Sequence, residues 1–157
     1  MTEAKNFHAR CKLYKGYYDI SIIKQLHPDV CRVIFGDNTL KLGMGGQACI
    51  RYLPASFGIA TKLLPSQMEN SFFEDGNEEH KQFIEDDLQE LENLLKTNTT
   101  LVVYFPEYGL GTGLSEMPVK CPNLFKHMNK LIKEKFGIDY TQFNPQIGDN
   151  NGSISNV

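Results

Sequence analysis

The chain has 157 residues, of which 41% are hydrophobic and 22% charged, and its formal net charge is −3 at pH 7. These values are typical of one globular domain, and the slightly acidic balance argues against direct nucleic-acid binding through a basic surface. No apolar run approaches the roughly 18 residues of a membrane-spanning helix, and the N-terminal residues lack the hydrophobic core of a signal peptide. We therefore expect a cytoplasmic protein with no membrane partner.

In chain order, apolar alternation and short apolar runs predict strands over residues 7–14, 30–35, 58–64 and 101–105. Helical spacing and capping residues predict helices over 20–26, 47–52, 78–96 and 123–136. Because strands alternate with helices, we expect an α/β domain with a largely parallel sheet over residues 1–143. Residues 144–157 are rich in Asn, Gly and Ser, which predicts a flexible C-terminal tail.

Residues that bind metals in proteins are scattered along the chain. The cysteines form no Cys-x-x-Cys pair, so we expect free thiols at Cys11, Cys31, Cys49 and Cys121. The histidines are isolated from one another and from any carboxylate at ligand spacing: His8, His27, His80 and His127. We therefore expect no metal site and no cofactor.

Two glycine-rich stretches follow apolar strands. Residues 43–48 read GMGGQA, and residues 106–113 read PEYGLGTG. Glycine adopts positive φ without penalty, and its missing Cβ lets an anionic ligand approach the backbone amides. Loops after parallel strands meet where such sheets bind ligands. The two stretches therefore predict a pocket for a phosphorylated ligand, although each loop could instead be only a tight turn.

The order of these motifs resembles the macro domain, the ADP-ribose-binding α/β/α module, over residues 7–138. Residues 33–38 (VIFGDN) resemble the family's strand that ends in an asparagine, and the two glycine-rich stretches resemble its two ligand-binding loops. The resemblance implies a three-layer α/β/α domain with a mixed, largely parallel sheet. The pattern also resembles phage-encoded proteins, which would place the protein in the host cytoplasm.

The resemblance implies a ligand site for ADP-ribose or a related NAD-derived nucleotide. Asn38 would lie near the distal ribose, the loops would hold the diphosphate, and Asp19 would read the adenine from a stretched version of the family signature. The implied ligand-binding residues are Asn38, Gly43, Gly45, Gly46, Gln47, Pro106, Gly109, Leu110, Gly111, Thr112, Gly113 and Asp19.

An enzymatic alternative remains open. In one hydrolytic subfamily a strand lysine attacks the ribose, and an aspartate after the second loop assists. Lys62 matches that lysine, and Asp37 is a candidate general base. Ser115 occupies the position of the subfamily's aspartate, with Glu116 one residue later. Nucleotide binding is the first hypothesis, removal of ADP-ribose from a macromolecule or small molecule the second, and a structural or interaction role the third.

The adjacent aromatics Phe72 and Phe73 lie in a polar stretch beside Glu74 and Asp75. Such a pair is typical either of a lid over a pocket or of the edge of a hydrophobic core. The sequence leaves both interpretations open.

Overall fold

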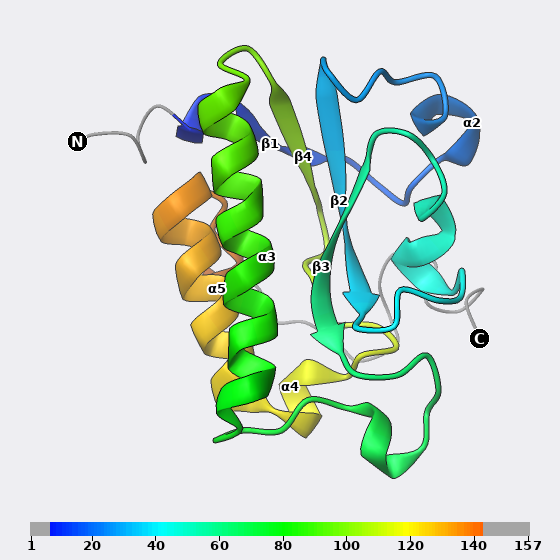
Figure 1. The fold of residues 1–157 in the computed structure, drawn as a ribbon, viewed down its shortest axis with the longest axis vertical. Helices are drawn as coiled ribbons and strands as arrows, with labels where there is room; N and C mark the ends of the chain where they lie inside the picture. Colours follow the sequence, from blue (N-terminus) through cyan, green and yellow to red (C-terminus); the bar gives the residue numbers. More distant parts are fainter. Residues whose placement is uncertain (1–6, 143–157) are drawn as a thin grey trace.

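A four-stranded parallel sheet forms the centre of the protein (Figure 1). The computed structural model describes residues 7–142, so the expected tail over 144–157 lies outside the described part. In the spatial order β1-β4-β2-β3, the strands are Cys11–Tyr14, Val102–Pro106, Cys31–Asn38 and Ser56–Lys62. The expectation of a largely parallel sheet is confirmed, and every strand pair within residues 7–142 is parallel.

Helices cover both faces of this sheet (Figure 1). Helices α3 (Glu78–Thr97) and α5 (Pro122–Phe136) pack on one face, and α2 (Ile20–Ile23) and the 3-10 helix η1 (Gly46–Ile50) lie on the other. Each face has its own hydrophobic core, the larger one on the α3 and α5 side. The three-layer α/β/α architecture is therefore confirmed. The remaining short elements are η2 (Glu69–Ser71), α4 (Met117–Lys120) and η3 (Tyr140–Gln142).

The two long helices follow from local sequence signals. The Asn77 side chain caps α3 by accepting a hydrogen bond from the His80 backbone N–H, and acidic residues occupy the first turn, where they suit the helix dipole. Helix α5 ends at Phe136 and is capped by Gly137, whose φ is +77°. A Cβ at Gly137 would meet the His8 ring at 2.7 Å, so this helix end requires glycine both for its conformation and for its packing.

The first strand is shorter than expected. The chain turns over residues 7–10, where the Arg10 N–H bonds the Phe7 carbonyl, and β1 begins only at Cys11. The Arg10 guanidinium donates to the carbonyls of Leu95 and Asn98 at the end of α3. The prediction of a strand from residue 7 was therefore wrong, because these side-chain bonds bend the chain toward α3.

Strand β2 is longer than expected and ends at Asn38 rather than at residue 35. Pairing with β3 continues through Asp37 opposite Ala60 and Asn38 opposite Lys62. Partner pairing, which the local sequence does not reveal, extends the strand through Gly36. As a result Asp37, Asn38 and Lys62 lie together at the carboxyl edge of the sheet.

Two neighbouring strands send their chains to opposite faces at this edge. Strand β2 leads into η1 on one face, whereas β4 leads through α4 into α5 on the other (Figure 1). A crevice between strands with divergent connections is the usual ligand site of an open α/β sheet. The two glycine-rich loops begin at these two strand ends.

Phe72 and Phe73 belong to the core. They are only 5% and 1% exposed. The core-edge interpretation is confirmed, and the lid interpretation was wrong, because neither ring is available to cover a ligand.

Candidate functional site

Two adjoining hollows lie at the carboxyl edge of the sheet. The smaller has a volume of about 50 Å³ and is lined by backbone from both glycine-rich loops, namely Gly45, Gly46 and residues 111–113. The larger has a volume of about 290 Å³ and lies toward the end of β3. Gly36, Gly45, Leu114 and Ser115 line both hollows. The two hollows therefore adjoin along these four residues.

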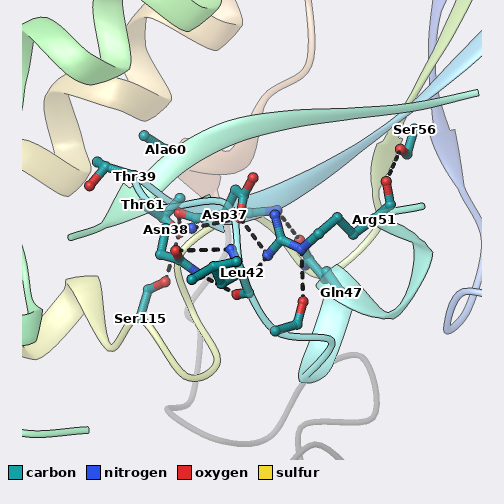
Figure 2. A network of polar contacts seen from close by, with 12 residues as sticks. Asp37, Asn38, Thr39, Leu42, Gln47, Arg51, Ser56, Ala60, Thr61 and Ser115 are labelled. Carbon is teal, nitrogen blue, oxygen red and sulfur yellow. Dashed lines mark hydrogen bonds and ion pairs between the residues drawn. The ribbon is translucent and has the colours of Figure 1, made fainter. Parts of the chain in front are cut away.

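An arginine holds the beginning of the first loop. Arg51, one helical turn beyond Gln47, forms an ion pair with the Asp37 carboxylate at 2.7 Å. Its guanidinium also donates to the carbonyls of Gly43 at 2.7 Å and Leu42 at 3.0 Å. The Asn38 amide donates to the same Leu42 carbonyl at 2.8 Å (Figure 2). Asp37 therefore stabilises the first loop through Arg51, and Asn38 stabilises it directly through the Leu42 carbonyl.

A single amide joins the two loops. The Gln47 Oε1 accepts the Gly36 backbone N–H at 2.9 Å, and its Nε2 donates to the Gly109 carbonyl at 2.7 Å. Gln47 therefore connects the end of β2, the first loop and the second loop. Both of these side-chain atoms serve the fold, although the residue also lines the smaller hollow.

Two hydroxyl groups meet where the hollows join. Thr61 Oγ1 and Ser115 Oγ lie 2.7 Å apart, and Thr61 also contacts the Asp37 carbonyl at 3.2 Å (Figure 2). Thr61 is fully buried, whereas Ser115 is partly exposed and lines both hollows. Ser115 is thus placed to contact a ligand that passes from one hollow to the other.

The second loop is shaped by its contacts with Met117 and Tyr140. Gly111 has a φ of +76°, and a Cβ there would meet the Met117 Sδ at 2.3 Å. The Tyr140 hydroxyl donates to the Pro106 carbonyl at the start of the loop. Glycine at position 111 is therefore required by the fold itself, whether or not a ligand is bound.

Lys62 is a buried ammonium on the wall of the larger hollow. The residue is 5% exposed, and its Nζ donates to Gln67 Oε1 at 2.5 Å and to the Leu114 carbonyl at 3.3 Å. Its Nζ also lies 4.8 Å from the centre of the Phe72 ring. Burial lowers the pKa of Lys62 to about 8, against the opposing attraction of the Glu116 carboxylate.

The structure brings most of the predicted site residues together. Those that line at least one hollow are Asp37, Asn38, Gly43, Gly45, Gly46, Gln47, Lys62, Gly111, Thr112 and Gly113. The prediction of a shared pocket at the carboxyl edge agrees with this arrangement. Ligand contact by these residues stays a prediction.

Four predicted contacts line neither hollow. Pro106 and Gly109 support the second loop through their carbonyls, and Leu110 is fully buried in the main core. Asp19 caps α2, where its exposed carboxylate accepts the Ser21 backbone N–H at 2.9 Å. Hydrogen bonding to Ser21 lowers the pKa of Asp19. Adenine recognition by Asp19 stays a prediction.

Arg51, Thr61 and Gln67 were absent from the predicted site. Arg51 follows the first loop by one helical turn, so its spacing was a usable signal. Thr61 is adjacent to Lys62 and stands where the register between β2 and β3 shifts, since Asp37 is opposite Ala60 and Asn38 is opposite Lys62. Gln67 lies in a polar stretch without periodicity, and nothing in the sequence marks it.

Residues 7–142 contain no cluster of three His, Cys, Asp or Glu side chains arranged for a metal ion. All four cysteines are free thiols, and burial raises the pKa of Cys11 and Cys121 to about 12. Over the same described residues, no helix has the length and apolar character needed to cross a membrane.

Comparison with known proteins assigns the chain to a family. Residues 14–131 match a family of unknown function (DUF7831). This match covers well over half of the chain, so the protein belongs to that family. No curated protein and no solved structure matches the chain.

Proposed function

We propose that the protein binds ADP-ribose or a related NAD-derived nucleotide between its two glycine-rich loops. One observation carries this proposal: backbone of both loops lines the same small hollow, at the carboxyl ends of the adjacent parallel strands β2 and β4. This edge is where open α/β sheets bind ligands. Backbone amides of glycine-rich loops suit an anionic group. The resemblance to macro domains supports the choice of nucleotide.

The sizes of the hollows fit a ligand with a compact anionic part. The smaller hollow, at about 50 Å³, exceeds the roughly 10–15 Å³ that a cavity needs to admit one water, so it has room for a compact group such as one phosphoryl group. The larger hollow would then receive the part of the ligand beyond that group. A nucleotide sugar joined through a diphosphate has this form.

Calorimetric titration with ADP-ribose tests the proposal, with AMP and NAD as comparison ligands. We expect saturable binding that Gly45→Val weakens by at least tenfold. Gly45 lines both hollows, and its φ of −78° is one that any residue adopts. Gly111→Val is a poor probe, because Met117 and the positive φ would disturb the loop itself. A thermal melt of the Gly45 variant shows whether its fold is retained.

Absence of heat with all three ligands would overturn the proposal and favour the interaction role. Equal binding by wild type and a folded Gly45→Val variant would also contradict it. In that case the ligand would lie outside the two hollows.

A second candidate function is hydrolysis of an ADP-ribosyl bond, favoured by the environment of Lys62. A pKa of about 8 leaves roughly a tenth of the amine uncharged at pH 7 and therefore nucleophilic. Asp37 is already paired with Arg51, so Lys62 is the stronger candidate of the two. Lys62→Ala would abolish release of ADP-ribose from a modified protein while retaining ADP-ribose affinity. Equal turnover by wild type and variant would contradict a role for this lysine.

We also propose that the protein acts in the cytoplasm, on a free ADP-ribose-like molecule or an ADP-ribosylated target. If the chain is phage-encoded, this is the host cytoplasm. Support comes from the four free thiols and from the resemblance to phage-encoded proteins.

A further inference from the structure

We propose that the larger hollow is a second anion subsite, in which the Lys62 ammonium binds a phosphate or carboxylate group lying beyond the group held by the glycine-rich loops. The inference rests on the proposed function, because it takes the smaller hollow as the first anion site. It adds a class of ligand: molecules with a chain of linked anionic groups that reaches from the smaller hollow past Ser115 to Lys62.

The position of Lys62 carries this inference. Lys62 lines the larger hollow at the end of β3, and its Nζ uses two of three ammonium hydrogens, for Gln67 and the Leu114 carbonyl. Both acceptors are neutral, so the buried positive charge has no hydrogen-bonded counter-ion among the described residues. A buried cation bonded only to neutral groups is stabilised when an anion enters beside it.

The charges around the hollow permit an anion. The Asp37 carboxylate is neutralised by Arg51 at 2.7 Å, and both residues line this hollow. Glu116 is connected to Lys62 through Gln67, whose Nε2 donates to Glu116 Oε2 at 3.0 Å. A further cation, Lys120, lies 4.6 Å from the centre of the same Phe72 ring that Lys62 contacts. The carboxylate that acts on Lys62 is therefore Glu116, which accepts its hydrogen bond from the neutral Gln67 amide, and Lys120 lies against the same ring.

The two hollows adjoin, so the two anionic groups can belong to one molecule. Leu114 and Ser115 line both. A chain of linked phosphates would place successive groups in the first hollow, past Ser115 and then beside Lys62.

Protonation gives an independent signature. With a pKa of about 8, Lys62 is about half protonated at pH 8, and a bound anion raises this pKa. Binding at pH 8 therefore takes up about half a proton per site. A ligand confined to the smaller hollow takes up fewer protons.

Inorganic polyphosphates test the subsite without a nucleoside. We expect triphosphate to bind about tenfold more tightly than pyrophosphate, with the same preference for ATP over ADP, in metal-free buffer. Lys62→Gln should bring both ratios to about one, whereas Lys62→Arg should retain them. Lys120→Gln is the matched control, because Lys120 contacts the same ring but lines neither hollow, and it should retain most of the preference.

Proton uptake is measured by titrating triphosphate at pH 8 in buffers of different ionisation enthalpy. Wild type should take up about half a proton more than Lys62→Gln, because the titration of triphosphate itself contributes to both proteins and cancels in the difference. Because the signal reports the lysine itself, it separates a direct contact from a general effect of the substitution on the fold.

The outcomes separate this inference from the proposed function. Binding of ADP-ribose with a triphosphate-to-pyrophosphate ratio of one or less overturns the anion subsite and leaves the nucleotide proposal standing. A Lys62-dependent preference for triphosphate without ADP-ribose binding supports the anion subsite and overturns the nucleotide proposal. Failure of every phosphate ligand to bind overturns both.

Discussion

The Asp37 carboxylate and the Arg51 guanidinium form an ion pair of 2.7 Å, in which the two side chains are 8% and 6% exposed. The same guanidinium holds the Leu42 and Gly43 carbonyls and lies 5.5 Å from the centre of the Phe35 ring. This arginine therefore ties the first loop to the end of β2. Asp37 serves as its anchor, which leaves the carboxylate poorly placed to act as a general base.

Arg51→Met should destabilise the protein by about 3–5 kcal/mol, because it leaves the Asp37 carboxylate buried without its partner. Urea unfolding measures this change. The double variant Asp37→Asn/Arg51→Met should lose less than the two single variants added together, since neither charge is then left alone. A single-variant loss below about 0.5 kcal/mol would mean that water reaches Asp37 easily.

Gln47→Glu should loosen the connection between the two loops. The glutamate can still accept the Gly36 N–H but cannot donate to the Gly109 carbonyl, so two acceptors would face each other. We expect a loss of about 1–3 kcal/mol in unfolding free energy and weaker ADP-ribose binding. Gln89→Glu on the exposed face of α3 is the matched control. A variant as stable as wild type would show that this amide is not a required bridge.

Gly111→Ala should cost about 1–3 kcal/mol, through a positive φ and through contact with Met117. The two causes are separable. In a Met117→Ala background the steric part should disappear, leaving the roughly 1–2 kcal/mol of the left-handed conformation. Equal losses in both backgrounds would assign the whole effect to the backbone.

Lys62 should make stability depend on alkaline pH. Its pKa is about 8 in the fold and 10.5 at its ordinary value, so the unfolded chain binds more protons between these pH values. Stability should therefore rise from pH 8 to about 10.5, by about 1–3 kcal/mol relative to Lys62→Met. Tyrosines and cysteines also titrate in this range, but they do so in both proteins. Their contribution therefore cancels when the stability of Lys62→Met is subtracted from that of wild type. An unchanged difference across this range would contradict the lowered pKa.

Local patterns predicted the elements whose signals are local. The apolar stripe of helix α3 predicted its bounds to within one residue, because helical spacing is a property of residues a few turns apart. The first half of the expected strand 7–14 failed, because Arg10 bonds to carbonyls in the last turn of α3 and in the segment after it, 85 to 91 residues away. Strand β2 likewise continues past residue 35 because of a distant segment, since residues 36–38 pair with β3.

The sequence by itself determined the alternating α/β architecture and the two glycine-rich loops at strand ends, since periodicity and glycine are properties of neighbouring residues. Only the tertiary structure decided how the site residues are used. Asp37 pairs with Arg51, Gln47 joins the loops, and Lys62 is desolvated against Phe72. Hydrogen-bond partners and desolvation depend on which distant segments pack together, and that is set by the sheet order β1-β4-β2-β3 rather than by any single stretch of the chain.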